Sequence, residues 1–270
     1  MLLEVETRMP GGLKSKVAMI TGGNSGIGEA TARRFAKIGA KVTILARREA
    51  EGRAVQEAIR AEGGEVTFLP CDVTDRAAVE AAVARTVNIY GGLHVLINNA
   101  GGGAREMFPE ESDETWERIL RVNLTACFFT CRAAWPHLIK AGGGAIVNVS
   151  SLSAVSGVSD AVLERYPSLP SASYIAAKAG LEGFTRYIAS LGGRHNIRVN
   201  CVRPGQILTK RLTTAAGEHV FARHFEMWQL IKGPGYAEDV ANAILFLASD
   251  ESRFITAEMV NIDGGAAAKL

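Results

Sequence analysis

Short apolar runs alternate along this chain with longer stretches of helical composition, and this alternation restricts the folds that it can adopt. Apolar strands joined by helices form βαβ units, which build a parallel sheet covered by helices on both faces. Strands are predicted at 17–20, 42–45, 66–69, 93–97, 145–149, 199–202 and 259–262, and helices at 27–38, 50–61, 76–89, 113–140, 173–191 and 237–247. Pro136 marks a kink or an early end of the fourth helix. The sequence therefore predicts an α/β fold with one doubly wound parallel sheet.

The composition is that of an ordinary globular chain and excludes several functional classes. Hydrophobic residues make up 47% and charged residues 21% of the 270 residues, enough for a large core without disulfides or metals. The net charge of +2 is too small to favour nucleic acid or an anionic membrane as a partner. No apolar stretch resembles a signal peptide or reaches the length of a membrane span. We expect a cytoplasmic protein, with residues 1–13 as a loosely specified N-terminal extension and residues 14–270 as one domain.

The four cysteines carry no recognisable metal or redox motif. Cys71, Cys127, Cys131 and Cys201 include no CxxC pair, and no histidine stands at a ligand-like spacing from them. Cys127 and Cys131 are four residues apart in a predicted helix and share one face, which leaves a metal or redox role as an alternative. Because buried free thiols usually act as small apolar side chains, we expect no metal site.

A glycine-rich turn follows the first predicted strand and precedes the first predicted helix. Gly22, Gly26 and Gly28 lie in the segment TGGNSGIG at 21–28. At such a turn, glycine lets the backbone approach a pyrophosphate, and the helix N-terminus offers unpaired N–H groups. Glycines also serve turn geometry alone, but their position inside a βαβ unit favours a dinucleotide site.

The end of the second predicted strand indicates which dinucleotide binds. NAD-binding folds usually carry Asp or Glu about 20 residues past the glycine loop, where the carboxylate bonds the ribose 2′-OH. This strand instead ends in Arg47 and Arg48, without a carboxylate to repel a 2′-phosphate. One charge-assisted bond from a guanidinium contributes roughly 1.5–3 kcal/mol. NADP(H) is therefore favoured and NAD(H) is the alternative; on a third interpretation, both arginines merely begin the next helix.

Tyr174 and Lys178 stand four residues apart at the start of a predicted helix, so their side chains share one face. A phenol ordinarily titrates at about 10, so a phenol that acts as an acid–base group near neutral pH needs a nearby ammonium to stabilise its anion. This spacing also occurs by chance on protein surfaces. Here, however, Ser150 and Ser151 end one predicted strand and Asn98 ends another, at the sheet edge where open α/β folds bind ligands.

Together, these motifs resemble those of the short-chain dehydrogenase/reductase superfamily over nearly the whole chain, from Lys16 to Gly265. The matching segments are TGGNSGIG at 21–28, CDVTD at 71–75, NNAG at 98–101, RVNL at 121–124, IVNVSS at 146–151, YIAAK at 174–178, RPGQILT at 203–209 and NIDGG at 261–265. The resemblance implies a single-domain Rossmann-type fold and an oxidoreductase that moves a hydride between nicotinamide and a carbonyl or secondary alcohol carbon. It also implies a homo-oligomer, a dimer or tetramer, that associates through the helices around 113–138 and 173–191.

The resemblance further implies roles for individual residues. Tyr174 would be the acid–base group, Lys178 would bind the nicotinamide ribose, and Ser151 would orient the substrate oxygen. Asn123 would hold a water that links Lys178 to solvent. The implied cofactor contacts are Gly22, Asn24, Ser25, Gly26, Ile27, Gly28, Arg47, Arg48, Asp72, Val73, Asn98, Ala100, Gly101, Tyr174, Lys178, Pro204, Gly205 and Thr209. In this set Asp72 and Val73 would contact the adenine, Asn98 would support the cofactor from its strand, and Thr209 would touch the nicotinamide carboxamide.

The spacing between the serine and the tyrosine departs from the family pattern. Ser151 and Tyr174 are 23 positions apart, a longer gap than usual, so the segment 160–170 must loop out for the two side chains to meet. Tyr166 is a rival phenol, but Pro170 stands where its lysine would be, and Tyr174 keeps the role.

Two further departures concern single positions. Ala257 replaces a glycine that is usual in the family, which we interpret as a minor packing change. The pair Asn24-Ser25 lacks the basic residue that many NADP-binding members carry in this loop, which weakens the case for NADP(H).

The segment 208–236 is expected to cover the substrate, because the corresponding family segment follows the PG motif and varies with substrate. Its apolar residues would form a lid, or else pack against the domain or a second subunit; they are Phe221, Phe225, Met227, Trp228 and Leu230. A largely apolar or aromatic carbonyl compound fits such a lid best, and interleaved basic side chains could meet a carboxylate.

Three functions are compatible with the sequence. The first is NADPH-dependent reduction of a ketone, including a 3-oxoacyl compound. The second is oxidation of a secondary alcohol or diol with NAD. The third is a nucleotide-binding regulatory protein without catalysis, which is disfavoured because Asn123, Ser151, Tyr174 and Lys178 are all present.

Overall fold

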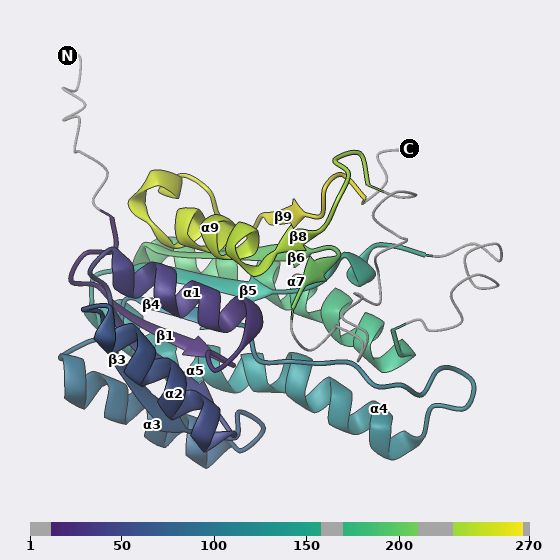
Figure 1. The fold of residues 1–270 in the computed structure, drawn as a ribbon, viewed down its shortest axis with the longest axis horizontal. Helices are drawn as coiled ribbons and strands as arrows, with labels where there is room; N and C mark the ends of the chain where they lie inside the picture. Colours follow the sequence, from purple (N-terminus) through teal and green to yellow (C-terminus); the bar gives the residue numbers. More distant parts are fainter. Residues whose placement is uncertain (1–11, 158–169, 210–228, 267–270) are drawn as a thin grey trace.

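A seven-stranded parallel sheet forms the centre of the molecule (Figure 1). The computed structural model describes residues 12–157, 170–209 and 229–266. The strand order is β3-β2-β1-β4-β5-β6-β9, and every neighbouring pair is parallel. The strands span Val17–Thr21 (β1), Lys41–Ala46 (β2), Glu65–Pro70 (β3), Val95–Asn98 (β4), Gly144–Val149 (β5), Ile197–Pro204 (β6) and Met259–Ile262 (β9). The order reverses between β1 and β4, the point at which open α/β sheets bind ligands.

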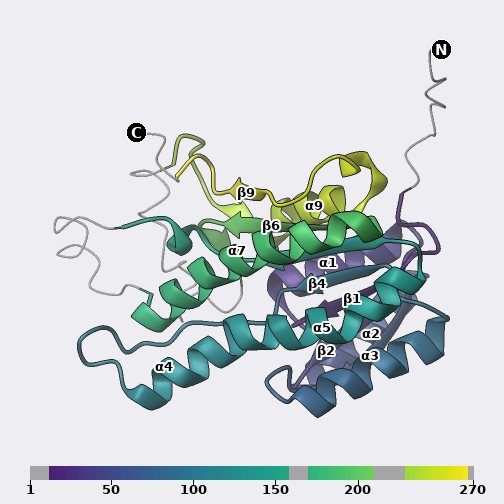
Figure 2. The ribbon, with the colours of Figure 1, turned by 180° about the vertical axis from the view of Figure 1, so that it is seen from behind.

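Helices cover both faces of the sheet (Figures 1 and 2). One face carries α1 (Gly26–Lys37), α2 (Glu49–Ala61) and α9 (Ala237–Ala248). The other carries α3 (Arg76–Tyr90), α4 (Asp113–Leu120), α5 (Ala126–Lys140) and α7 (Ala172–Gly192). This arrangement confirms the predicted single-domain, doubly wound fold of Rossmann type.

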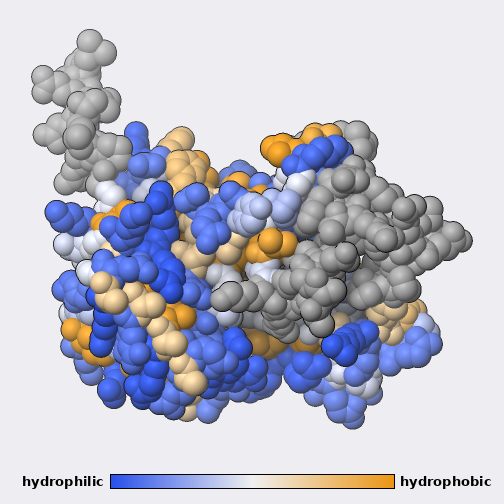
Figure 3. All heavy atoms as spheres, in the orientation of Figure 1, coloured by the Kyte–Doolittle hydropathy of each residue, from blue (hydrophilic) through white to orange (hydrophobic). Residues whose placement is uncertain are grey.

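Alternate residues of each strand supply two separate cores. On β1, Ala18 and Ile20 pack in the core that contains Phe35 of α1, whereas Val17 and Met19 pack on the opposite face. These five side chains are at most 1% exposed. Successive side chains of a strand point to opposite faces, and both faces are covered here, which is why the strands read as unbroken apolar runs. The outer surface over α1 and α2 is mostly hydrophilic, with scattered apolar residues (Figure 3).

The long helix predicted at 113–140 contains an irregular turn and does not end early. A π-helical turn, Arg121–Thr125, separates α4 from α5, and α5 continues past Pro136 to Lys140. Of the two alternatives expected at Pro136, a kink or an early end, the early end is therefore wrong. A proline inside a helix removes one backbone hydrogen bond, and the packing of Ala134 and Leu138 in the core on either side of it keeps the last turn in place.

The two ends of the segment 208–236 are held together, and residues 210–228 between them lie outside the described residues. The short strands β7 (Ile207–Leu208) and β8 (Gly235–Tyr236) pair in parallel. The lid candidates Phe221, Phe225, Met227 and Trp228 fall in the undescribed part, whereas Leu230 is described and is 64% exposed.

The structure also bears on two further expectations, the N-terminal extension and the absence of a membrane span. Leu13, which we counted with the N-terminal extension, is buried in the core beside α1, and residues 1–11 lie outside the described part. Among the described helices, none combines the length and apolar character needed to cross a membrane.

Candidate functional site

A cleft of about 340 Å³ opens at the carboxyl edge of the sheet, next to the point where the strand order reverses. It is lined by Ile27, Asn99, Gly101, Gly102, Gly103, Val149, Ser150, Ser151, Tyr174, Lys178, Pro204, Gly205, Ile207 and Thr209. The ends of β4, β5 and β6 and the starts of α1 and α7 contribute these residues. The cleft therefore brings together Ser151, Tyr174 and Lys178 with five of the other expected cofactor contacts.

Tyr174 and Lys178 are held at the start of α7. Ser171 caps this helix, because its hydroxyl accepts a hydrogen bond from the Tyr174 N–H. Lys178 is 4% exposed, and its Nζ donates to the Val149 carbonyl at 2.8 Å. The same Nζ lies 5.5 Å from the centre of the Tyr174 ring. A buried ammonium fixed beside a phenol can stabilise negative charge on the phenol oxygen.

Ser151 follows β5 and lines the cleft. Its Oγ accepts a hydrogen bond from the Ser153 N–H at 3.2 Å, so it caps the short 3₁₀ turn Leu152–Ala154. Residues 158–169, in the segment that connects Ser151 to Tyr174, lie outside the described residues. The rival phenol Tyr166 is among them. Despite the long gap in sequence, Ser151 and Tyr174 line the same cleft.

Asn123 lies in the π-helical turn and is fully buried. Its Nδ2 donates to the Gly102 and Ile119 carbonyls at 2.9 Å, and its Oδ1 accepts from the Gly102 N–H at 3.2 Å. A side chain on Gly101 would come within 2.5 Å of the Asn123 Oδ1. The Asn123 side chain thus fixes the glycine loop after β4 to the π-helical turn between α4 and α5, a contact that the sequence did not reveal.

The glycine loop between β1 and α1 forms a cradle that fits a pyrophosphate. Gly22 and Gly26 have φ values of +66° and +54°, and a Cβ on Gly28 would lie 2.2 Å from the Gly22 carbonyl oxygen. Among the described residues around Gly26, only Thr209 has side-chain atoms within 4 Å of an added Cβ. Ser25 precedes α1 without a side-chain cap, whereas Ser171 caps α7, so no described side chain accepts a hydrogen bond from the first N–H groups of α1. Such a helix start binds anions.

Asn98, the last residue of β4, and Asn99, which follows it, contact different parts of the protein. Asn98 is 2% exposed and bonds inside the fold, donating to Asn148 Oδ1 at 2.9 Å and accepting from Thr130. Asn99 lines the cleft and donates to the Thr21 and Gly22 carbonyls. Both stand in the NNAG motif, but only the alternation of side chains along β4 distinguishes the inward residue from the one at the cleft.

Two arginines stand where the 2′ position of an adenosine ribose is expected. Arg48 donates to Ser25 Oγ at 3.2 Å, and the Asn24 amide, turned so that its oxygen faces Arg48, accepts at 3.2 and 3.3 Å. Arg47 is 74% exposed, and its Nη1 lies 3.9 Å from Asp72 Oδ2. Burial alone would raise the pKa of Asp72, but hydrogen bonds from Thr74 and the charges of Arg47 and Arg121 outweigh it and lower the pKa.

The buried cysteines behave as apolar side chains. Burial raises the pKa of Cys71 and of Cys127 to about 11, and all four thiols are free and buried. A thiol with such a pKa is uncharged at neutral pH and is a poor metal ligand or nucleophile. Within the described residues, no group of three His, Cys, Asp or Glu side chains could hold a metal ion.

Comparisons with known proteins extend over nearly the whole chain. A family model described as enoyl-(acyl carrier protein) reductase matches residues 22–267. The 2,5-dichloro-2,5-cyclohexadiene-1,4-diol dehydrogenase LinX of Sphingobium indicum is 40% identical over 94% of this chain and 96% of its own length. The 3-oxoacyl-(acyl-carrier-protein) reductase FabG of Chlamydia pneumoniae is 35% identical over 94% of this chain and 97% of its own. A solved structure from Burkholderia xenovorans, described as a short-chain dehydrogenase/reductase, aligns with a TM-score of 0.85 at 37% identity, covering 96% of this chain and 98% of that one.

Proposed function

Because this chain belongs to the short-chain dehydrogenase/reductase superfamily, we propose that it interconverts a ketone and a secondary alcohol with NADP(H) as its preferred cofactor. Membership makes it an oxidoreductase of alcohol or carbonyl substrates that uses a nicotinamide cofactor. The observation that carries the finer proposal is the meeting of Tyr174, Lys178 and Ser151 in one cleft beside the glycine cradle.

The residues around the cleft suit each part of the cofactor. The start of α1 would hold the pyrophosphate on its N–H groups, Lys178 would bind the nicotinamide ribose, and Thr209 would contact the carboxamide. When bound, the nicotinamide supplies a hydride to a carbonyl carbon or accepts one from an alcohol carbon.

Tyr174 would exchange a proton with the substrate oxygen, because its phenol lines the cleft beside the buried Lys178 ammonium. Ser151 would donate a hydrogen bond to the same oxygen. The Lys178 ammonium would stabilise charge on the phenol oxygen, and its bond to the Val149 carbonyl fixes its position. Asn123 supports this arrangement by holding the Gly102 backbone.

The preference for NADP(H) is supported by Arg48 and Arg47. Arg48 already donates hydrogen bonds to Ser25 and Asn24 of the glycine loop, and Arg47 projects into solvent beside Asp72. A 2′-phosphate between them would receive charge-assisted hydrogen bonds, which are the stronger kind.

A second candidate is the NAD-dependent oxidation of a diol or other secondary alcohol. The 40% identity to a protein named as a diol dehydrogenase favours it. The two candidates differ in cofactor and in direction, so one set of rate measurements separates them.

The test is the initial rate of NADPH and of NADH oxidation with a panel of ketones, oxoesters and diketones, together with calorimetric titration of both nucleotides. We expect turnover with NADPH and a lower Kd for NADPH than for NADH. The same preparation is then assayed for NAD- and NADP-dependent oxidation of secondary alcohols and diols at high pH. Turnover that needs NAD and a diol would replace the first candidate with the second, and tight nucleotide binding without any turnover would support the regulatory alternative.

A further inference from the structure

Helix α7 carries a further polar side chain, Glu182, on the face that presents Tyr174 and Lys178. Glu182 stands one helical turn beyond Lys178 and is only 3% exposed. A buried carboxylate is costly unless charged or polar partners compensate it. The partners of Glu182 therefore indicate what this residue is for.

The charged partner of Glu182 is Arg203, which forms a two-pronged contact. Arg203 Nε donates to Glu182 Oε1 at 2.6 Å, and Arg203 Nη2 donates to Glu182 Oε2 at 2.5 Å. This ion pair raises the pKa of Arg203. Arg203 is the residue directly before Pro204 and Gly205, which line the cleft. The ion pair thus connects α7 to the end of β6 and the Pro204–Gly205 turn.

A second partner joins the same carboxylate to the end of β5. Ser150 Oγ lies 3.0 Å from Glu182 Oε1 and 3.3 Å from the Lys178 carbonyl oxygen, and it can donate to either. The Ser150 N–H donates to the Val202 carbonyl of β6 at 2.8 Å. Ser150 directly precedes Ser151. One buried carboxylate therefore contacts the ends of β5 and β6 behind the cleft.

We propose that the Glu182–Arg203 ion pair is a positioning device that sets Ser151 and the Pro204–Gly205 turn relative to Tyr174 and Lys178. Neither charged group lines the cleft, so the pair acts through its neighbours. The inference rests on the proposed function, because the geometry it fixes is that of the cofactor and substrate oxygen. An ion pair that only stabilises the fold could be replaced by apolar residues of similar volume without loss of cofactor affinity or turnover. A pair that positions the site could not.

The experiment removes both charges at once and compares the result with the removal of a partly buried arginine elsewhere on the same strand. The double variant Glu182→Met/Arg203→Met keeps volume and leaves no unpaired charge. The control is Arg198→Met, at the opposite end of β6, where the guanidinium donates to the Leu247, Ser249 and Ile255 carbonyls. For each protein we would measure the thermal midpoint, the Kd of NADPH by calorimetry, and kcat and KM.

We expect the double variant to unfold near the wild-type midpoint, while its Kd for NADPH rises about tenfold and its kcat falls about tenfold or more. Arg198→Met should show the reverse, a lower midpoint with Kd and kcat within about twofold of wild type. A double variant whose Kd and kcat both stay within about twofold of wild type would overturn the proposal.

Two safeguards keep the outcome decisive. If the double variant does not fold, Arg203→Lys keeps the charge but loses the two-pronged contact, and a Kd and kcat unchanged in that variant would equally overturn the proposal. If the wild type binds NADPH but turns over no substrate, the proposed reaction fails, and the comparison of Kd values still decides the role of the pair.

Discussion

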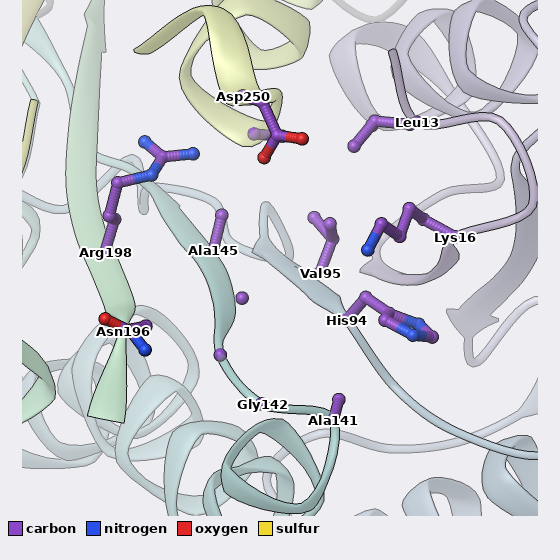
Figure 4. A pocket seen from close by; sticks show the side chains of 13 residues that line it. Leu13, Lys16, His94, Val95, Ala141, Gly142, Ala145, Asn196, Arg198 and Asp250 are labelled. Carbon is purple, nitrogen blue, oxygen red and sulfur yellow. The ribbon is translucent and has the colours of Figure 1, made fainter. Parts of the chain in front are cut away.

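A cavity opens at each end of the strands of the sheet, at the amino edge and at the carboxyl edge. Only the cavity at the carboxyl edge carries the features of an active site. The carboxyl-edge cleft measures about 340 Å³ and the amino-edge cavity about 230 Å³. Figure 4 shows the amino-edge cavity, with side chains of Lys16, His94, Arg198 and Asp250 arranged around it. By charge alone, this cavity would be the stronger candidate for a binding site.

The difference lies in how the polar groups are used. At the amino edge, His94 Nδ1 accepts the Val17 N–H at 3.0 Å, and Arg198 donates to three backbone carbonyls and to the Ser252 hydroxyl. At the carboxyl edge, hydroxyls line an open cleft and a helix start stands without a side-chain cap. An active site needs reactive side chains that face one open cavity. Polar side chains whose hydrogen bonds go to backbone groups stabilise the fold instead.

The largest expected effect is the loss of turnover when Tyr174 is replaced by Phe. This change removes the proton that the substrate oxygen exchanges but no contact of the glycine cradle. We expect kcat to fall by about three orders of magnitude, within the range for acid–base groups, while the Kd for NADPH stays within about threefold. Steady-state kinetics and calorimetry measure the two quantities.

The matched control for that change is Tyr187→Phe, which alters an exposed tyrosine on the same helix. It should leave kcat within about twofold of wild type. Substantial turnover by Tyr174→Phe would mean that another group donates the proton and that the carboxyl-edge cleft owes its chemistry to a different residue.

The next largest effect concerns Arg48 and Arg47. Removing either guanidinium should raise the Kd of NADPH by about ten- to a hundredfold and change that of NADH by less than about threefold, because only NADPH carries the 2′-phosphate. Arg53→Ala on α2 is the control, since Arg53 pairs with Glu49 on the same exposed surface. Equal losses of affinity for the two nucleotides would show that neither arginine contacts the 2′-phosphate.

The sequence predicted the fold and the central pair of the site because both are encoded in local patterns. The spacing of Tyr174 and Lys178 on one helical face, and the glycines at a strand-to-helix turn, need no knowledge of distant residues. Contacts between residues far apart along the chain escaped prediction. Glu182 and Arg203 pair across 21 positions, and the clamp of Asn123 on Gly102 also spans 21.

The backbone conformation of Ala257 was also beyond the sequence alone. Ala257 has a φ of +64°, in the left-handed region that favours glycine. The replacement of the usual glycine is therefore a change in backbone strain and is more than the minor packing change that we expected. Its N–H donates to the Val199 carbonyl at 2.8 Å, so pairing with β6 holds the strained residue in place.

At the amino edge, a pH effect on stability is expected instead of an effect on turnover. Burial, reinforced by the charge of Lys16, lowers the pKa of His94 below its ordinary value of 6.5. Between the lowered pKa of His94 in the folded protein and the ordinary value of 6.5, the unfolded chain binds a proton that the folded protein excludes. The free energy of unfolding therefore falls as pH drops below about 7. His94→Asn retains an acceptor for the Val17 N–H and should weaken this pH dependence.

Urea unfolding at pH 7.5, 6.5 and 5.5 measures that dependence, with His137→Asn on α5 as the control for loss of an imidazole elsewhere. The kcat of His94→Asn at pH 7.5 should stay within about twofold of wild type. A tenfold fall in kcat without a change in stability would give the amino-edge cavity a functional role and remove the contrast between the two edges.

The smallest expected effect is a gain in stability from Ala257→Gly, just before β9 on the amino-edge side of the sheet. Relief of a left-handed alanine contributes about 1–2 kcal/mol, and the extra freedom of glycine in the unfolded chain offsets about 0.5–1 kcal/mol of it. The thermal midpoint should rise by about 1–4 °C. Gly91→Ala is the converse control and should lower the midpoint, because Gly91 has a φ of +83°, and the added Cβ would meet no described residue within 4 Å beyond its chain neighbours and its own helix. If the amino edge serves only the fold, both variants shift the midpoint in these opposite directions while kcat stays within about twofold, and a change in kcat without a shift in the midpoint would contradict that division.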